Sequence, residues 1–478
     1  MTNVYNTLQD SAKNWPTNMA VVDEYGQISF SELANQTEIL KNFLLTQDIG
    51  KGMAVGIITR NSRYFIMALY AGVGCGALVM PISNTQKNKE IQDAIIEAQL
   101  HVLITDSYEL ASFGQNISEI KLFNQTLYIS HTKRDKKNRT ADFIPDAAFM
   151  RFTSGTTGKA KGVIISHESV LERVDAANEE LKLNEQDRVV WVLPMAYHFV
   201  VSIVLYFKYG VGIIVNDNFL AESIIQSINQ YKGTFLYAAP MHIKLLAIYK
   251  PDVELPTLKK VISTTTAISA EVCKAFENKY NLPVSQAYGI IEIGLPIINL
   301  KSSIQHPEAV GYALPAYTVE ILDDNFNTVE NETIGRMAIK GPGMFDGYLS
   351  PPTLRENVLQ HGWFMTGDYA LKKIDGLLIV KGREKNVINV SGNKVFPNEV
   401  EEVINGYKGI VTSKAFSKVH PLMGEVVAVD IIIEKDAIID IEELRNYCKQ
   451  TLSSFKLPQF INVVDKIEMT NSGKVKRA

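Results

Sequence analysis

The chain has 478 residues, more than one hydrophobic core usually supports, so two or more domains are expected. With 46% hydrophobic and 21% charged residues it has the composition of an ordinary soluble globular protein. A net charge of -4 gives no reason to expect a nucleic-acid binder, and the one basic run, "HTKRDKKNRT", is interpreted as a solvated loop.

The N-terminal end shows no basic start followed by an apolar core, so no signal peptide is expected. The uncharged stretch at 65–82 is long enough to cross a membrane. Its glycines and Pro81 favour instead a buried helix followed by a short strand, and no membrane span is expected. The cysteines at 75, 273 and 448 lie far apart without metal-site spacing, which indicates core residues and a cytoplasmic location.

The first two-thirds of the chain alternates β-branched runs with amphipathic segments. Strands are expected at 54–60, 101–106, 188–194, 212–217 and 259–264, with helical patterns such as "ESIIQSINQY" and "AEVCKAFENKY" between them. This alternation predicts an α/β fold with a mostly parallel sheet covered by helices.

The pattern changes from about Gly311. "TVEILDDNFNTV" and "GRMAIKG" are typical of antiparallel strands joined by turns. The last stretch then contains a helix start "PNEVEEVINGY", a strand "EVVAVDIII", a helix "IEELRNYCKQTL" and a final strand, which together have the size of a small α+β domain. The charged, glycine-containing turn near 382–386 suits a hinge between domains.

The loop in "MRFTSGTTGKAKGVIISH" is dense in Gly, Ser and Thr, so many backbone N–H groups and hydroxyls can converge on an anion. Lys159 and Lys161 add positive charge. The loop is not a Walker A loop, because Thr153 stands where the first glycine is needed and Ala160 follows Lys159. The other glycine clusters lack the dinucleotide-binding spacing.

Further motifs follow in order down the chain: "WVLPMAYHF" (191–199), "AYGIIE" (287–292), "GRMAIKGPGMFDGY" (335–348), "GWFMTGDYA" (362–370), "GREKNVINVSGNKVFPNEVE" (382–401) and "TNSGKVKR" (470–477). Together with "FTSGTTGKAKG" they resemble the motifs of the AMP-forming adenylating enzymes. That superfamily includes acyl- and aryl-CoA synthetases, nonribosomal adenylation domains and beetle luciferases.

The resemblance implies a large N-terminal domain of helix-covered, mostly parallel sheets with a small β-barrel-like part, followed by a small, mobile α+β C-terminal domain. The expected division is 1–381 for ATP and acid binding, 382–385 as the hinge, and 386–478 for the C-terminal domain, which carries the catalytic lysine. ATP is the expected co-substrate and Mg²⁺ the expected ion. The expected partners are a small carboxylic acid and either CoA or an acyl carrier protein.

The resemblance also implies roles for individual residues. The residues expected to be catalytic are Lys474, Glu292 and His198, with Glu292 also the Mg²⁺ ligand. The acid pocket is expected at Tyr197, His198 and Ile291, the hinge at Lys385, and the thiol tunnel at Gly392. The residues expected to bind ATP are Thr153, Ser154, Gly155, Thr156, Thr157, Gly158, Lys161, Thr264, Thr265, Thr266, Ala287, Tyr288, Gly289, Ile290, Asp368 and Arg383.

Two departures from the family pattern stand out. Ile291 replaces the family's Thr, which removes a hydroxyl contact worth about 1.5–3 kcal/mol to a charged phosphate. The family's Gly-Gly-Ala-Pro turn is Thr-Thr-Thr-Ala at 264–267, so bulkier side chains should narrow the site or add hydrogen bonds.

The segment after Phe199 carries no acid to bind an α-ammonium, which argues against an α-amino acid substrate. An aryl or short-to-medium acyl acid is expected. Whether Tyr197 or His198 takes the family's gate position stays open.

Three functions are compatible with these motifs and departures. The first is an acid–CoA ligase that forms an acyl-adenylate and then a thioester. The second is a stand-alone adenylating enzyme that loads a carrier protein. The third is a degenerate nucleotide-binding protein without activity, suggested by Ile291 and opposed by Asp368, Glu292 and Lys474.

Overall fold

The computed structural model describes residues 3–153, 161–420, 424–435 and 437–468. Its contacts divide the chain into two compact units. The first comprises Met1–Pro307, Gly311–Thr318 and Lys340–Trp363, and the second comprises Glu308–Val310, Val319–Ile339 and Phe364–Ala478. The second unit thus includes segments that precede residue 382, and the position of the hinge at 382–385 stays a prediction.

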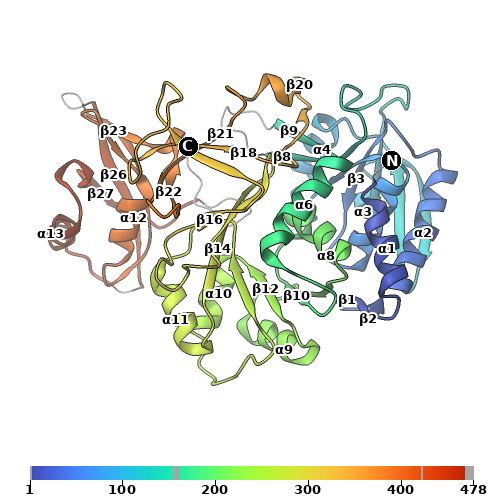
Figure 1. The fold of residues 1–478 in the computed structure, drawn as a ribbon, viewed down its shortest axis with the longest axis horizontal. Helices are drawn as coiled ribbons and strands as arrows, with labels where there is room; N and C mark the ends of the chain where they lie inside the picture. Colours follow the sequence, from blue (N-terminus) through green and yellow to red (C-terminus); the bar gives the residue numbers. More distant parts are fainter. Residues whose placement is uncertain (1–2, 154–160, 421–423, 436, 469–478) are drawn as a thin grey trace. The chain divides into compact units, whose positions relative to one another are not determined.

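One large sheet of the first unit runs in the order β16-β15-β14-β13-β12-β10-β11-β1-β2 (Figure 1). Neighbours from β14 to β1 pair in parallel, whereas β16-β15-β14 and β1-β2 are antiparallel. The strands are β1 (Met19–Asp23), β2 (Gly26–Ser29), β10 (Arg188–Trp191), β11 (Gly212–Val215), β12 (Phe235–Ala238), β13 (Lys260–Ser263), β14 (Val284–Ile290), β15 (Gly294–Ile298) and β16 (Tyr312–Ala313).

Three amphipathic helices, α9 (Ala221–Tyr231), α10 (Pro240–Ala247) and α11 (Ala270–Tyr280), lie beside this sheet (Figure 1, green to yellow). Their apolar side chains share a buried core with Leu236 and Val261 of the strands. The strands and helices expected here are confirmed, which reflects the strong period-2 and period-3.6 patterns of the sequence.

The second large sheet runs in the order β20-β19-β9-β8-β4-β3-β5-β7-β6. Strands β8, β4, β3 and β5 pair in parallel, and the pairs at both ends are antiparallel. The strands are β3 (Ala54–Ile58), β4 (Leu78–Pro81), β5 (Val102–Thr105), β6 (Gln115–Leu122), β7 (Gln125–His131), β8 (Ala147–Thr153), β9 (Lys161–Ser166), β19 (Gly347–Tyr348) and β20 (Thr353–Leu354).

The remaining helices of the first unit surround the two sheets. They are α1 (Tyr5–Asn14), α2 (Phe30–Thr46), α3 (Arg63–Gly74), α4 (Asn88–Glu97), α5 (Tyr108–Ala111), α6 (His167–Leu181), α7 (Met195–His198), α8 (Val204–Lys208), the π-helical turn η1 (Phe199–Ile203) and the 3₁₀ turn η2 (Arg355–Asn357). The buried helix and strand expected at 65–82 are confirmed as α3 and β4. Within the described residues no helix has both the length and the apolar character that a membrane span requires.

The second unit contains an antiparallel sheet in the order β17-β18-β21-β22, from β17 (Thr318–Leu322), β18 (Gly335–Lys340), β21 (Phe364–Lys372) and β22 (Leu378–Arg383). The tail adds the sheet β24-β23-β26-β25, with β27 beside β26. Its elements are β23 (Ile388–Val390), β24 (Asn393–Val395), β25 (Ile410–His420), β26 (Gly424–Ile433), β27 (Phe460–Val463), α12 (Pro397–Asn405), α13 (Ile441–Thr451), and the 3₁₀ turns η3 (Glu384–Asn386) and η4 (Ser454–Lys456).

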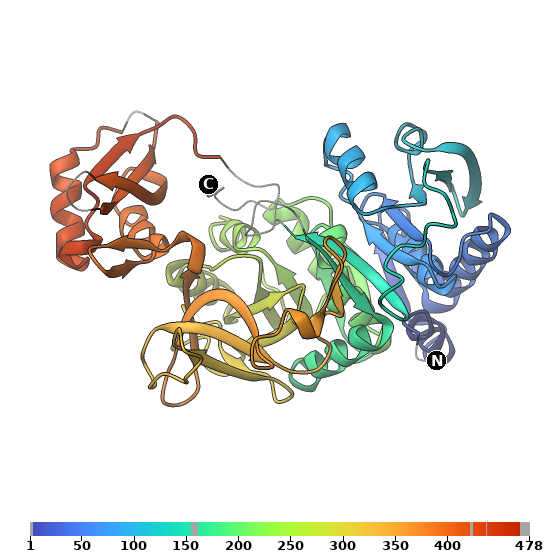
Figure 2. The same ribbon diagram turned by 90° about the horizontal axis from the view of Figure 1, so that it is seen from above.

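Helices α12 and α13 cover the tail sheet (Figure 2, orange to red). Val400 of α12 and Leu444 of α13 share one core with Val427, Val429 and Ile431, which alternate along β26 and so point to one face. The expected α+β character of the tail is thereby confirmed.

The hairpin between β23 and β24 turns through two residues in the left-handed region. Ser391 has φ 49° and Gly392 has φ 86°. Two positive φ values are typical of a type I′ turn, whose twist matches that of the flanking strands. A Cβ on Gly392 would meet no atom within 4 Å, so backbone conformation and not crowding accounts for this glycine.

We predict that Gly392→Ala lowers the free energy of unfolding by about 1 kcal/mol, because a left-handed conformation penalises a side chain. Gly392→Asn should cost about half as much, since Asn tolerates this region better. Urea unfolding of both variants checks this. Equal stability of the Ala variant and the parent protein would contradict it.

Candidate active site

Residues expected to contact the acid and the nucleotide meet at one edge of the first sheet. Strands β12, β13 and β14 are parallel, so their carboxyl ends share one edge, where ligands bind in open α/β sheets. There the Tyr237 hydroxyl donates a hydrogen bond to Thr264 Oγ1 over 3.2 Å. The ring of His198 lies edge-on to Tyr237, with centroids 6.4 Å apart. Tyr237 thus connects the expected pocket residue His198 to the expected nucleotide residue Thr264.

Sequence reasoning missed Tyr237. It lies in "FLYA", an apolar run in which this hydroxyl is the only polar side-chain group. Burial raises the pKa of the Tyr237 phenol, which therefore remains a hydrogen-bond donor at neutral pH.

Tyr197 and His198 face different partners. Helix α7 is held by Asn61, which accepts a hydrogen bond from Met195 N over 2.8 Å and donates to Leu193 O over 3.0 Å. The π-helical turn η1 follows, a rare form often found at functional sites. The backbone oxygen of Tyr197 accepts a hydrogen bond from Arg151, whose guanidinium lies 5.3 Å from the centre of the Tyr197 ring.

Arg151 was not among the expected site residues. Burial lowers the pKa of its guanidinium to about 10, while the neighbouring Tyr197 and Glu292 oppose the shift. The side chain therefore keeps its positive charge at neutral pH.

The Thr-Thr-Thr-Ala stretch begins where β13 ends. Thr264 is buried, and Thr265 has φ 78°. A left-handed conformation is rare for a β-branched residue and stores strain. The family pattern has glycine at the position of Thr265. Threonine there therefore adds backbone strain and also narrows the site.

Ala287, Tyr288, Gly289 and Ile290 form the end of β14. The pairing with β15 shifts register between Tyr288 and Ile290, which marks a β-bulge. A Cβ on Gly289 would lie 2.6 Å from the oxygen of Gly294, so only glycine fits this close approach. Tyr288 is half-buried at the bulge.

Glu292 lies among side chains that are distant in sequence. Its Oε1 accepts a hydrogen bond from the Tyr348 hydroxyl over 3.4 Å, and its backbone oxygen accepts one from Phe345 N over 2.7 Å. The Lys161 ammonium lies 4.8 Å from the centre of the Tyr348 ring. Lys161 in turn pairs with Thr153 across the β8–β9 hairpin. The structure thus brings Lys161, Tyr348 and Glu292 together, and Tyr348 was not expected there.

Glu292 can bind a metal ion whose other ligands come from substrate and water. The carboxylate is half-buried, and Mg²⁺ usually takes one or two carboxylates together with phosphate oxygens and water. No group of three or more metal-ligating side chains occurs in the part of the chain that is described. An ion at Glu292 would therefore depend on substrate phosphates.

Arg173 of α6 fixes the segment before Glu292. Its side chain is fully buried, and its Nη1 donates to Ile291 O over 2.9 Å and its Nε to Gly343 O over 2.7 Å. The same loop is held by Glu172, which accepts from Gly343 N over 2.8 Å. Burial lowers the pKa of Arg173 to about 10, so it too stays charged at neutral pH. Arg173 is a positioning residue that sequence reasoning missed.

Asp368 and Arg383 meet in the second unit. Adjacent strands β21 and β22 set them opposite each other, and Arg383 Nε lies 3.0 Å from Asp368 Oδ1. Arg383 Nη1 also donates to Thr366 O over 3.1 Å, and Asp368 N donates to Thr366 Oγ1 over 3.1 Å. Two expected nucleotide residues are thus joined by an ion pair on a rigid antiparallel pair of strands.

The other expected residues have simpler surroundings or are not described. Lys385 is exposed on η3, and Gly392 lies in the β23–β24 turn. Ser154, Gly155, Thr156, Thr157, Gly158 and Lys474 lie outside the described residues.

Thr265 offers a test of strain. We expect Thr265→Gly to raise the free energy of unfolding by about 0.5 kcal/mol, because release of a left-handed side chain outweighs the entropic cost of glycine. The matched control Thr266→Gly, whose φ is not positive, should lower it by about 0.5–1 kcal/mol. Chemical denaturation measures both. An equal loss in the two variants would show that Thr265 is unstrained.

Arg173→Met should lower the free energy of unfolding by about 3 kcal/mol or more, because it leaves a buried and a partly buried carbonyl oxygen without a charged donor. Arg188→Met is the control, since Arg188 makes one such bond, to Tyr231 O over 2.8 Å, and is only partly buried. Thermal unfolding compares the two. A smaller effect at Arg173 than at Arg188 would contradict its positioning role.

Family models match most of the chain. The model described as "AMP-binding enzyme" matches residues 8–349, and "AMP-binding enzyme C-terminal domain" matches residues 399–474. A 2-succinylbenzoate–CoA ligase of Listeria monocytogenes is 29% identical over 99% of this chain and 98% of its own length. A long-chain-fatty-acid–CoA ligase of Yersinia pestis is 28% identical over 98% and 92%.

The fold is also similar to a solved structure. The o-succinylbenzoate CoA synthetase of Bacillus subtilis, in complex with an acyl-adenylate intermediate, aligns with a TM-score of 0.86 at 21% identity, covering 98% of this chain and 96% of its own. This supports the arrangement of a large α/β domain with mixed sheets and a smaller C-terminal domain. With both family models matched in order, the chain belongs to the AMP-forming adenylating enzymes.

Proposed function

We propose that this protein is an ATP-dependent acid–CoA ligase that works through an acyl-adenylate. The observation that carries the proposal is the meeting of Lys161, Tyr348 and Glu292 beside the hairpin that bears the expected phosphate loop. There a cation lies over the ring of Tyr348, and a half-buried carboxylate accepts a hydrogen bond from the hydroxyl of the same tyrosine. This arrangement suits a magnesium nucleotide, in which phosphate oxygens bind both the ion and a lysine.

In the first half-reaction a carboxylate oxygen attacks the α-phosphorus of ATP, the bond to the bridging oxygen breaks, and pyrophosphate leaves. Both reactants are anions, so the step needs charge neutralisation and in-line positioning rather than an acid or a base. Lys161 and the 154–158 loop would hold the phosphates. Glu292 would hold Mg²⁺, which when bound neutralises phosphate charge.

Further expected residues would hold the nucleoside. Tyr288 would stack on adenine, with Ala287, Gly289 and Ile290 forming the adjacent backbone, and Thr264 to Thr266 would line the pocket. Asp368 would accept hydrogen bonds from the ribose hydroxyls. A carboxylate has about four acceptor sites, so it can do this while paired with Arg383.

The acid would lie near His198, Tyr197 and Ile291. The contact of His198 with Tyr237, which bonds Thr264, favours His198 as the side chain nearer the reacting groups. The similar proteins are named as ligases for 2-succinylbenzoate and long-chain fatty acids, which supports an aryl or acyl acid.

In the second half-reaction the thiolate attacks the acyl carbon, the bond to the phosphate oxygen breaks, and AMP leaves. CoA is the favoured thiol because the similar proteins are named CoA ligases. Rotation at Lys385 would exchange Lys474 for a thiol tunnel bordered by Gly392. The free cysteines at 75, 273 and 448 suit a reducing compartment, and we propose the cytoplasm.

The test is pyrophosphate release from ATP over a panel of aryl and acyl acids, with and without CoA. The proposal expects acid-dependent pyrophosphate, and acyl-CoA when CoA is present. Adenylate that is transferred only to a carrier protein would favour the carrier-loading function. ATP binding without release for any acid would indicate a non-catalytic protein.

Lys474→Ala should abolish adenylate formation, because one preorganised charge at the carboxylate and α-phosphate contributes about 2.7–4 kcal/mol. Thiolysis of a supplied acyl-adenylate should persist. Separate assays of the two half-reactions measure this, with Lys435→Ala, at an exposed lysine, as the control. Equal loss of both steps would contradict the role assigned to Lys474.

A further inference from the structure

We propose that the cavity at the carboxyl ends of β4 and β8 is an oxyanion subsite anchored by Arg151. The inference rests on the proposed function, because the oxyanion would belong either to the acid substrate, as a second carboxylate, or to the nucleotide, as a phosphate. Both groups share the chemistry that an arginine recognises.

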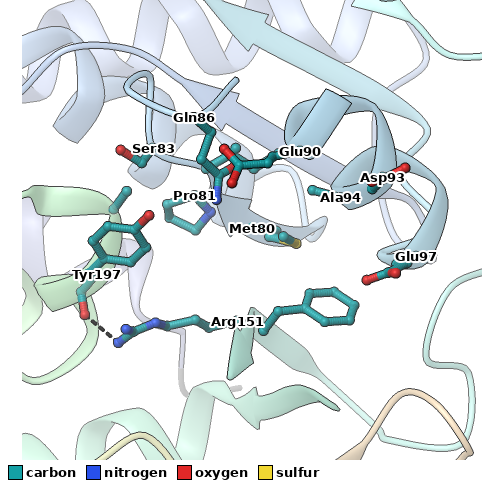
Figure 3. A pocket seen from close by; sticks show the side chains of 13 residues that line it. Met80, Pro81, Ser83, Gln86, Glu90, Asp93, Ala94, Glu97, Arg151 and Tyr197 are labelled. Carbon is teal, nitrogen blue, oxygen red and sulfur yellow. Dashed lines mark hydrogen bonds between the residues drawn. The ribbon is translucent and has the colours of Figure 1, made fainter. Parts of the chain in front are cut away.

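The cavity has a volume of about 260 Å³ and lies within the first unit. Its walls are apolar where Met80, Pro81, Phe152 and Ala196 line it. Strands β4 and β8 are parallel neighbours, so the cavity lies at the sheet edge where ligands bind in α/β folds. Figure 3 shows Arg151 and Tyr197 on one side of it and Asp93 and Glu97 on the other.

Arg151 forms no ion pair with a carboxylate among the described residues, although the charge of Glu292 acts on it from a greater distance. Its Nη1 donates to Tyr197 O, while its Nε is enclosed and makes no hydrogen bond within the described chain. A buried charge is normally paired, because desolvation without compensation is costly. The Nε edge of a guanidinium is the geometry that binds carboxylate or phosphate with parallel hydrogen bonds.

A second side chain at the cavity also has unused hydrogen-bonding capacity. Gln86 lines it, and its Oε1 is buried without a partner in the described residues. An amide can turn by 180° to present its N–H donors in place of its oxygen. Gln86 is thus able to add a neutral hydrogen bond to an anion held by Arg151.

The opposite end of the cavity repels anions. Asp93 and Glu97 of α4 line that end and are exposed, while Glu90 projects from the same helix face beside Gln86 (Figure 3). Their charge directs a single oxyanion to the Arg151 end. It also disfavours entry of a polyanion such as CoA over α4, so CoA should reach the acyl group by another side.

The position of Arg151 explains the two sources of the oxyanion. Arg151 donates a hydrogen bond to the backbone oxygen of Tyr197, an expected acid-pocket residue. A second carboxylate on the acid is therefore one possible source. Arg151 also precedes Thr153 by two residues, and the expected phosphate loop follows Thr153. A nucleotide phosphate is the other source.

The experiment compares Arg151→Gln and Arg151→Lys with the parent protein and with Arg139→Gln, a control at an exposed arginine. The acids are 2-succinylbenzoate and 4-oxo-4-phenylbutanoate, which differs only by lacking the ring carboxylate. If the oxyanion is a carboxylate, Arg151→Gln should lower kcat/KM for the dicarboxylate by about 10- to 100-fold and leave the monocarboxylate unchanged. Arg151→Lys should restore part of the loss.

If the oxyanion is a phosphate, the KM for ATP should rise by a similar factor with both acids, which also supports the subsite. Unchanged kinetics with both acids and with ATP would overturn it, as would an equal fall in kcat for every substrate accompanied by a lower Tm. Unchanged kinetics would show that Arg151 binds no substrate. An equal fall in kcat with a lower Tm would show that Arg151 only stabilises the fold.

A measurement without turnover separates this inference from the proposed function. In the parent protein, 2-succinylbenzoate or inorganic pyrophosphate should raise the unfolding temperature, and Arg151→Gln should lose that protection. A parent protein that makes no AMP from any acid would refute the proposed function alone. Equal protection of parent and variant by both anions would refute the subsite.

Discussion

A buried cation determines the geometry of the candidate site. Arg173 of α6 binds the backbone oxygens of Ile291 and Gly343, which belong to segments separated by about 50 residues. The two segments also meet directly, because Phe345 N donates to Glu292 O over 2.7 Å. Because the guanidinium is fully buried, its hydrogen bonds are not exchanged with water, and the carbonyls must stay in place. Glu292 follows Ile291 directly, and Tyr348 follows the glycine-containing loop, so Arg173 helps to place both.

The candidate residues stand on different kinds of element in each unit. Tyr237 and Thr264 lie at the ends of parallel strands buried in the sheet, and Asp368 and Arg383 lie on adjacent antiparallel strands of the second unit. The expected phosphate loop joins β8 to β9, a paired hairpin. Paired strands therefore carry the residues proposed to orient the nucleoside, and the residues proposed to bind the phosphates stand between β8 and β9 in the sequence. Such an arrangement suits a reaction in which the nucleoside is held in place while the acid attacks the α-phosphorus.

The parts of the fold that depend on local pattern were predictable. The apolar runs at 54–60 and 188–194 became β3 and β10, and "AEVCKAFENKY" became α11. Glu292, Lys161, Asp368 and Arg383 were predicted as site residues because they stand in ordered motifs. The structure places the first two near each other and pairs the other two.

Tyr237, Arg173, Tyr348 and Arg151 could not be assigned in this way. Each acts through a partner far away in the chain, and a lone arginine in a helix gives no sign that its side chain is buried. The left-handed conformation of Thr265 was equally hidden, since β-branched residues rarely adopt it. The sequence showed that Thr265 stands where the family has glycine, but it did not show that this threonine adopts a strained backbone conformation.

In the proposed reaction the acid is activated when one of its own oxygens bonds to the α-phosphorus. Supplying an accepted acid with both carboxylate oxygens labelled as ¹⁸O, with ATP and CoA, and then analysing the products by mass spectrometry tests this directly. Activation through an acyl-adenylate leaves one ¹⁸O atom in each AMP and none in pyrophosphate. Label in orthophosphate with ADP as the other product, or unlabelled AMP beside newly formed thioester, would contradict it.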